Sequence, residues 1–297
     1  MDCEKLGWFP SGFGLKDHSV FWFDGYYYLV SISVPNDTRF AYGRSTDLCN
    51  WEELAPVLPR RPPDSWEEFL IWAPFVYEED GLYFMYYTGV TYDYTQSIML
   101  ATSNNPADPA AWQPQGMIFQ PSHPGMRWVV GVPADCRDPM VLKVNDLYYL
   151  YYTGLDDQGA IVGLATAPAP QGPWTDWGAV LSIGSAHRMM ESPTVAIFSG
   201  LYYLFYNQVT QGEEYRVGAS PGGPWAEQRD FGPGWANEVW TGQDGNTYTS
   251  YLTNYSVTIK RMGWDTFFEI PRPFIGENVF HLMIPHTTNG LRLDISP

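Results

Sequence analysis

Three carboxylates stand at equivalent places in repeated segments of the chain. Asp17 and Asp138 each lie eight residues before the turn of their segment, and Glu191 lies nine residues before Gly200. Cleavage of a glycosidic bond needs one carboxylic acid to protonate the leaving oxygen and a second carboxylate, as base or nucleophile, on the opposite face of the sugar. A third charge nearby raises one pKa so that this acid keeps its proton. A lone Asp before a strand usually only caps a loop, but three acids in register, with Arg137 beside one, favour a catalytic site.

Each acid belongs to a unit of strand, tight turn and second strand, and this unit occurs five times. Its turns combine Gly or Asx with aromatic and β-branched residues, which is typical of hairpins. The turns lie at positions 25, 81, 146, 200 and 245, and a Trp closes each unit, at Trp51, Trp112, Trp174, Trp225 and Trp264. Units of about four strands and 40–50 residues are typical of propeller blades. The sequence predicts an all-β, five-bladed β-propeller with four-stranded antiparallel blades around a central channel; a β-sandwich would not explain the aligned Trp series.

The repeat also predicts the domain organisation. We expect a single propeller domain over residues 1–297. Its blades should span about 12–54, 55–115, 116–178, 179–228 and 229–270, and 271–297 should either close the propeller or pack on its outside. Only 64–70 and 105–112 have a helical pattern. Long loops, where binding residues tend to lie, are expected at 57–70 and 121–134.

The first strand of each propeller blade lines the channel, so equivalent strand starts meet at one mouth of it. Asp17, Asp138 and Glu191 should therefore surround one pocket. Around them we expect aromatic side chains that stack on sugars and polar ones that bond hydroxyl groups or a carboxylate: Trp72, Phe75, Arg137, His18, Arg188 and Glu238. Core packing is the alternative for most aromatics in a chain with 13 Trp, but Trp72 holds the register of Arg137 and Glu191.

Charge and composition exclude several partners. A formal charge of −17 repels nucleic acid and anionic lipid, and no apolar run is long enough to span a bilayer. The five His are scattered without a close pair, so we expect no metal at the catalytic site. The oligomeric state stays open.

The cysteines and the N-terminus bear on the compartment. Cys3, Cys49 and Cys136 form an odd, scattered set, which favours a reducing compartment over a disulfide scaffold. The first residues lack the basic segment and apolar core of a signal peptide. We expect a cytoplasmic protein, or a secreted or periplasmic one if a signal has been removed.

Three motifs together resemble the glycoside hydrolases with a five-bladed propeller, chiefly family 43 with its relative family 32. Trp72-Ala73-Pro74 with the hairpin 80–87 is similar to the second-blade signature of family 43. Arg137-Asp138-Pro139 is similar to the third-blade motif, which in this form is also prominent in family 32. Glu191-Ser192-Pro193 resembles the Glu-x-Pro motif of the fourth blade. The resemblance covers about residues 10–265.

The resemblance implies a role for each acid. Asp17 would be the general base, Asp138 the group that orients and tunes the acid, and Glu191 the general acid, with inversion in family 43. In family 32 the first-blade Asp is a nucleophile and the outcome is retention. His18 stands where family 43 usually has Pro, and the Asn-Asp-Pro-Asn-like run of family 32 is absent. No cofactor is implied, although some propeller hydrolases hold a structural cation in the channel, and Ca²⁺ stays open here beside Asn237-Glu238.

The function expected is hydrolysis of a furanoside or pentoside linkage, arabinofuranosidase- or xylosidase-like, by paired carboxylates about 6.5–9.5 Å apart if inverting and about 5–5.5 Å if retaining. Two alternatives remain. One is a glycan-binding propeller without catalysis. The other is a fructosidase or a glycoside phosphorylase on the same fold. The phosphorylase would need a cationic pocket, for which only Lys16, Arg137 and Arg188 are near.

Overall fold

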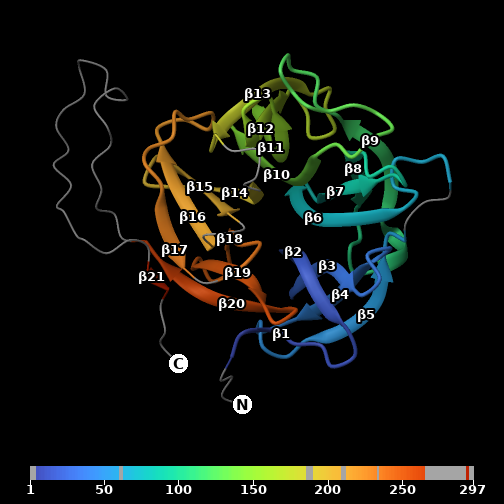
Figure 1. Cartoon of the computed structure of the whole chain (residues 1–297). Coiled ribbons are helices and arrows are strands. Elements are labelled where there is room, and N and C mark those ends of the chain that lie inside the picture. The colour runs from blue at the N-terminus through green and yellow to red at the C-terminus, as the bar shows by residue number, and fades with distance from the viewer. Residues whose placement is uncertain are drawn as a thin grey trace.

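The computed structural model shows five antiparallel sheets arranged around a common axis, with β2, β6, β10, β14 and β18 nearest to it (Figure 1). It describes residues 5–59, 63–184, 190–208, 212–232 and 234–264, and the short strand at 292–293. Within these ranges the helical content is one 3-10 turn, η1 (Pro109–Ala111). The prediction of an all-β, five-bladed propeller is confirmed.

The first four blades share one order, in which four consecutive strands run from the axis outward. Blade 1 contains β2 (Gly14–Phe23), β3 (Tyr26–Val34), β4 (Phe40–Ser45) and β5 (Glu52–Val57). Blade 2 contains β6 (Leu70–Glu79), β7 (Leu82–Val90), β8 (Gln96–Ser103) and β9 (Gln113–Phe119). Blade 3 contains β10 (Cys136–Val144), β11 (Leu147–Asp156), β12 (Gly159–Ala167) and β13 (Thr175–Ser182). Blade 4 contains β14 (Met190–Phe198), β15 (Leu201–Gln208), β16 (Gly212–Gly218) and β17 (Arg229–Gly232).

Blade 5 is built from both ends of the described chain. β18 (Glu238–Thr241), β19 (Thr247–Thr253) and β20 (Ser256–Gly263) follow blade 4, and the N-terminal strand β1 (Gly7–Trp8) pairs with β20 as the fourth strand. β21 (Arg292–Leu293) also pairs with β20, at Met262 and Gly263. Most of the expected closing segment 271–297 lies outside the described residues. The N-terminal strand therefore joins the last blade to the first.

Turn chemistry explains the hairpins between first and second strands. In the first blade Asp24 and Gly25 have φ of 44° and 85°, and in the second Asp80 and Gly81 have φ of 52° and 77°. Two successive positive φ values define the I′ turn, which matches the right-handed twist of the flanking strands. The Asp-Gly pairs seen in the sequence therefore fix the strand register that brings the first strands together.

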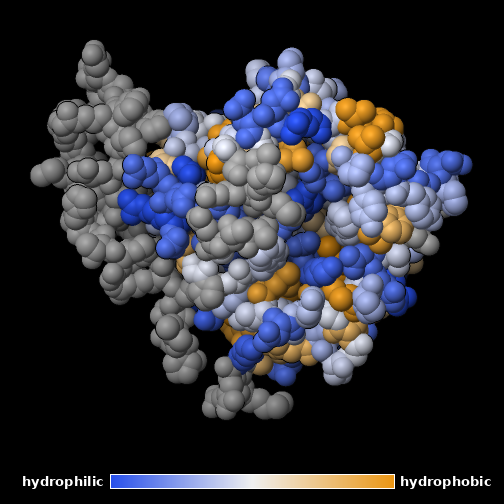
Figure 2. All heavy atoms as spheres, in the orientation of Figure 1, coloured by the Kyte–Doolittle hydropathy of each residue, from blue (hydrophilic) through white to orange (hydrophobic). Residues whose placement is uncertain are grey.

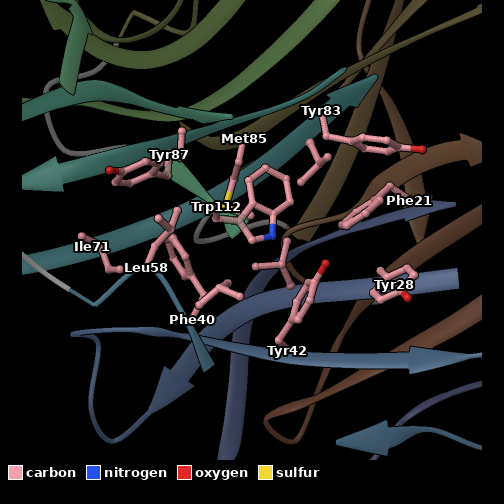
Figure 3. Packing of buried hydrophobic residues seen from close by; sticks show 14 of the residues in the cluster. Phe21, Tyr28, Phe40, Tyr42, Leu58, Ile71, Tyr83, Met85, Tyr87 and Trp112 are labelled. Atoms are coloured by element: carbon pink, nitrogen blue, oxygen red, sulfur yellow. The ribbon is translucent and has the colours of Figure 1, made fainter. Parts of the chain in front are cut away.

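The core lies between the blades, where aromatic faces of neighbouring sheets meet. Between blades 1 and 2, Phe21 contacts Tyr83 at a centroid distance of 5.5 Å, and Tyr87 meets Phe40 edge to face at 5.8 Å (Figure 3). The periodic tryptophans occupy these seams. Trp112 packs between blades 1 and 2, Trp174 between 2 and 3, Trp225 between 3 and 4, Trp264 between 4 and 5, and Trp51 between 5 and 1. The repeated Trp residues therefore mark the interfaces between neighbouring blades.

Repeated tyrosine hydroxyls reinforce the same seams. Tyr42, Tyr86 and Tyr151 each donate a hydrogen bond of 2.7 Å to a proline carbonyl in the next blade, at Pro106, Pro170 and Pro221 respectively. Such buried hydroxyls need a partner because an unsatisfied one costs about 1–3 kcal/mol. The bonds fix one blade against the next and hence hold the inner strand starts in place.

One cysteine expectation is wrong. Cys49 is disulfide-bonded, whereas Cys136 is a buried free thiol. Three cysteines allow one disulfide, and because Cys49 forms one, the cysteines no longer favour a reducing compartment. In the described part of the chain we find no helix with the length and hydrophobicity needed to cross a membrane.

Candidate active site

A bulge near the start of the inner strands of blades 1 to 4 sets which side chains reach the axis. The pairing register shifts around Asp17 in β2, and between Trp72 and Phe75, Arg137 and Met140, and Glu191 and Thr194 in β6, β10 and β14. Left-handed backbone lies at three of these bulges, with φ of 45° at Ala73, 55° at Asp138 and 53° at Ser192, and also at Ala236 (53°) just before β18. Bulges re-aim side chains, so two successive residues of one strand reach the same cavity instead of opposite faces.

That cavity, at the mouth where the inner strands begin, has a volume of about 600 Å³. It collects the three predicted carboxylates, Asp17, Asp138 and Glu191, together with the predicted contacts Trp72 and Arg137. Its remaining lining is Leu15, Lys16, Ser192, Trp235, Leu252, Asn254 and Tyr255. Residues more than 170 positions apart in sequence thus share one site, as the strand alignment predicts.

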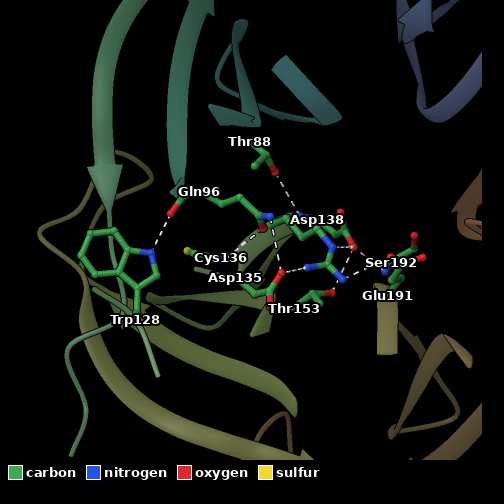
Figure 4. A network of polar contacts seen from close by, with 10 residues as sticks. Thr88, Gln96, Trp128, Asp135, Cys136, Asp138, Thr153, Glu191 and Ser192 are labelled. Atoms are coloured by element: carbon green, nitrogen blue, oxygen red, sulfur yellow. Dashed lines mark hydrogen bonds and ion pairs between the residues drawn. The ribbon is translucent and has the colours of Figure 1, made fainter. Parts of the chain in front are cut away.

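Arg137 is the electrostatic centre of the site, and Figure 4 shows its partners Asp135, Asp138 and Glu191 within one polar network. Its guanidinium donates to Asp135, bonds Glu191 Oε1 at 3.1 Å, and lies 3.7 Å from Asp138 Oδ2. Gln96 Nε2 lies 3.4 Å from Asp135 Oδ1, and Gln96 Oε1 accepts from the Cys136 amide. A guanidinium shared by three carboxylates offsets part of their mutual repulsion, so the acids are held together despite their like charge.

Asp138 ties the strands of blades 2, 3 and 4 to one another. Its Oδ2 accepts bonds from Thr153 Oγ1 at 3.0 Å and from the Ser192 amide at 2.9 Å. Its own amide donates to Thr88 Oγ1 at 3.2 Å. The Ser192 bond fixes Asp138 against the residue that follows Glu191.

Asp17 and Glu191 both hold protons more tightly than ordinary carboxylic acids. Burial, Asp138 and Glu191 raise the pKa of Asp17 to about 8, against the opposing effect of Lys16 and Arg137. Burial and Asp138 likewise raise the pKa of Glu191, although Arg137 partly offsets this. Because the two acids influence each other, they titrate as a pair with two apparent pKa values. The site can therefore hold one proton between two carboxylates near neutral pH, which is the state that acid–base catalysis needs.

His18, Phe75 and Glu238 line a narrower channel of about 30 Å³ beneath the cavity. His18 Nε2 lies 2.7 Å from Ser250 Oγ in blade 5, and burial lowers the His18 pKa to about 3, which keeps the ring neutral. Glu238 Oε2 accepts from the Val20 amide at 3.2 Å, and burial raises its pKa. None of the three lines the main cavity, so their predicted sugar contacts stay predictions.

The cavity contains residues that the sequence did not predict, and one predicted contact cannot be placed. The predicted contact Arg188 lies outside the described residues. Trp235, Asn254 and Tyr255 line the cavity without having been predicted. Trp235 had a detectable signal, since it precedes Ala236 as Trp72 precedes Ala73. Asn254 and Tyr255 sit in the β19–β20 turn, for which the repeat carries no signal.

The residues described here contain no group of three or more His, Cys, Asp or Glu side chains arranged to hold a metal ion. A structural Ca²⁺ in the channel therefore stays a prediction.

Comparisons with known proteins agree with this architecture. The model of the glycosyl hydrolases of family 43 matches residues 12–127. An endo-arabinase from Bacteroides thetaiotaomicron VPI-5482 shares the fold with a TM-score of 0.67 at 16% identity, covering 88% of this chain and 98% of that one. An α-L-arabinofuranosidase from Lactobacillus brevis gives 0.66 at 14%, covering 93% and 97%. A sucrose-6-phosphate hydrolase from Lactobacillus gasseri gives 0.68 at 17%, covering 88% of this chain and 61% of that one.

No curated protein matches the chain by sequence. The family model covers the first two blades and the loop that leads into the third, including Asp17 and Trp72. The solved structures share the five-bladed fold over most of their length. The similarity to glycosyl hydrolases of family 43 is thus detected in sequence over residues 12–127, and the solved structures share the fold of the chain whose acids gather at the mouth.

Proposed function

We propose that the chain hydrolyses an arabinofuranoside or xyloside linkage with inversion, with Asp17 as general base, Glu191 as general acid and Asp138 as the group that orients Glu191. The observation that carries this proposal is the convergence of the three carboxylates and Arg137 in one cavity of about 600 Å³. Inversion needs water on the face of the sugar opposite the acid. Asp17 enters from blade 1 and Glu191 from blade 4, so the two acids approach from different strands.

The proton distribution supports paired acid–base roles. Arg137 bonds Glu191 directly and partly offsets the rise of its pKa, whereas Arg137 and Lys16 act on Asp17 through their charge alone. The productive form, with Asp17 ionised and Glu191 protonated, is one of two forms of the singly protonated pair. We expect a bell-shaped pH dependence of kcat/KM, whose limbs belong to the pair.

The lining of the cavity suits a small neutral sugar. Trp72 and Trp235 line the cavity, and indole rings can stack on the C–H faces of sugar rings. The channel below has a volume of only about 30 Å³, which is too small for a sugar ring. A sugar therefore enters from the mouth and is not threaded through the channel. This shape favours release of a terminal residue over internal cleavage.

A phosphorylase is the weaker alternative because the cations of the described cavity are already paired. Lys16 Nζ lies 3.4 Å from Asp37 Oδ2, and Arg137 is shared by three carboxylates. A phosphate would enter a site with excess negative charge and would be repelled.

The first test is hydrolysis of 4-nitrophenyl α-L-arabinofuranoside, β-D-xyloside and β-D-fructofuranoside by the wild-type protein and Glu191→Gln. We expect release from the first or second substrate and a loss of 10²–10⁴-fold in the variant. A β-D-fructofuranosidase activity would replace the proposed substrate class. Inactivity on all three, with retained binding of oligosaccharides, would favour the glycan-binding alternative.

Leaving-group dependence then separates the acid from the base. A 2,4-dinitrophenyl leaving group needs little protonation, so Glu191→Gln should recover most of its activity on the dinitrophenyl glycoside. Asp17→Asn should stay inactive on both because water still lacks its base. The opposite pattern would exchange the two roles. Proton NMR of the first product should show the inverted anomer, and a retained anomer would make Asp17 or Glu191 a nucleophile.

A further inference from the structure

Apolar side chains gather on one part of the mouth. The exposed fractions are 55% at Tyr92, 47% at Tyr94, 60% at Val129, 59% at Val130 and 45% at Val132. These are five of the eleven large exposed hydrophobic residues in the described chain. Figure 2 shows an apolar group at the rim where the loop between β9 and β10 runs. We call Phe69, Tyr92, Tyr94, Val129, Val130 and Val132 the rim platform. Contiguous exposed apolar surface of this kind marks interaction sites.

The aromatic half of the rim platform is an ordered cluster. Phe69 lies 5.1 Å from Tyr92 and 5.4 Å from Tyr94 between ring centroids, at interplanar angles of 36° and 76°. Tyr94 has a φ of 60°, a left-handed conformation that costs a non-glycine residue energy, and its amide donates to Thr91 O at 2.9 Å. Strain of this kind persists where the surrounding structure enforces it and often marks a functional segment.

The valine half is tied to the same hairpin by its backbone. Thr95 Oγ1 donates to Val132 O at 2.9 Å and accepts from the Gly131 amide at 3.1 Å. Ala134 N donates to Tyr94 O at 3.2 Å. The exposed valines therefore sit on a loop fixed by hydrogen bonds, and their apolar side chains are held in water. Such pre-ordering lowers the entropy lost when a ligand covers them.

The rim platform adjoins the cavity through two elements. Phe69 directly precedes β6, and Trp72 of the cavity follows three residues later, which is about 10 Å along a strand. On the other side, the valine loop leads into β10, where Asp135 binds Arg137. A ligand that fills the cavity and extends outward along β6 would reach Phe69 and Tyr92 next.

We infer that the rim platform binds the part of a glycan substrate that lies beyond the cavity, a neutral chain of several sugar residues. The inference rests on the proposed function in taking the ligand to be a glycan. Aromatic rings and aliphatic groups match the C–H faces of neutral sugars, and the acidic Asp93 and Glu68 beside the platform disfavour an anionic ligand. The protein would then favour oligosaccharides over short glycosides with the same terminal sugar.

The test compares substrates of increasing length. For wild type, Tyr92→Ala and Tyr92→Ala/Tyr94→Ala, kcat/KM is measured on the 4-nitrophenyl glycoside and on oligosaccharides of two to six units with the same terminal sugar. We expect the wild type to gain with length, and the variants to lose at least ten-fold more on the hexamer than on the aryl glycoside, through KM. Trp177→Ala is the matched control, because Trp177 is 57% exposed on the outer strand β13. Tyr92→Ala alone leaves the strained Tyr94 backbone unchanged.

Binding to Glu191→Gln, measured by calorimetry with the same oligosaccharides, separates this inference from the proposed function. Length-dependent affinity that Tyr92→Ala removes supports the rim platform even if no hydrolysis is found. Activity on the aryl glycoside without any effect of length or of Tyr92→Ala overturns the rim platform and leaves the proposed function intact. A dimer in sedimentation that Val130→Asp converts to a monomer would also overturn it, since the platform would then be an interface between two copies of the chain.

Discussion

Arg137 connects the residues on which the proposed chemistry depends. It binds Asp135, Asp138 and Glu191 at once, and Asp135 is only 28% exposed. Burial and the negative charges of Asp138 and Asp135 raise the pKa of Glu191, and the single guanidinium of Arg137 offsets this rise only in part. Asp135 therefore takes up part of the positive charge of Arg137, which would otherwise lower the pKa of Glu191 further.

Asp135→Asn should shift the pH profile. The amide still accepts a bond from Arg137 but no longer offsets its charge, so the apparent pKa values of the Asp17–Glu191 pair should fall. We expect the kcat/KM bell to move to lower pH by roughly half a unit or more, measured on the aryl glycoside between pH 4 and pH 9. Asp157→Asn is the control, because it removes the same charge from the exposed pair with Arg127 at 3.8 Å. An unchanged or upward-shifted bell would refute this role for Asp135.

The contribution of Asp17 to the stability of the folded protein should decrease as the pH rises. Its pKa is raised from 3.8 to about 8 in the folded protein, so between these values the folded state binds more protons than the unfolded state. Stability associated with Asp17 is therefore present below about pH 4 and lost as the pH rises towards 8. Asp17→Asn removes this penalty.

We accordingly expect the Asp17→Asn variant to melt close to wild type at pH 4 and at higher temperature than wild type at pH 8, in thermal scans followed by circular dichroism. Asp157→Asn should show no such divergence. An equal difference at both pH values would mean that Asp17 is not protonated as described.

The hairpin turns predict the inner strands but not the bulges in them. Asp17, Asp138 and Glu191 were found because their spacing to the hairpin turn is visible in the chain. Glu191 lies nine residues before its turn because it occupies the position of Arg137, while Ser192 occupies that of Asp138. The bulge that both strands share lets both positions reach the cavity.

Two predicted contacts show the consequence. His18 directly follows the bulge residue Asp17, and Phe75 lies two residues past the left-handed Ala73, so both line the lower channel. A strict alternation of strand faces carries no information about this change, because the bulge depends on backbone angles that several residue types adopt.

The left-handed position itself is testable at Ala73. With φ at 45°, an alanine costs roughly 1–2 kcal/mol that glycine does not, whereas glycine costs about 0.5–1 kcal/mol in chain entropy. Ala73→Gly should therefore be near neutral or slightly stabilising in urea denaturation. Ala101→Gly, in the middle of β8 with ordinary backbone angles, should destabilise by about 1 kcal/mol. Equal losses in both variants would show that the bulge at Ala73 is unstrained.

The whole molecule depends on how the ring of blades closes. Five blades follow from the repeat, and the Trp series follows from their seams. The closing strand could not be predicted in the same way, because β1 contains only Gly7 and Trp8. Two residues carry neither a period nor a turn signal, and their pairing with Thr258 and Val257 joins segments about 250 positions apart.

Trp8 should therefore be worth more to stability than its short strand suggests. Its side chain is 4% exposed and stacks on Trp51 at 6.0 Å and 17°, so that this pair of rings connects blades 5 and 1. Gly43 leaves room for it, since an added Cβ there would lie 3.0 Å from the Trp8 ring.

Trp8→Ala should cost about 3–5 kcal/mol, as for other buried Trp residues replaced by Ala, and lower the melting temperature in differential scanning calorimetry. Because a propeller seam joins blades that are distant in sequence, its loss should speed unfolding more than it slows folding if the ring closes after the blades have formed. Trp177→Ala, which removes an indole 57% exposed on β13, should change stability by less than about 0.5 kcal/mol. Similar losses in the two variants would mean that pairing of β1 with β20 does not hold the ring closed.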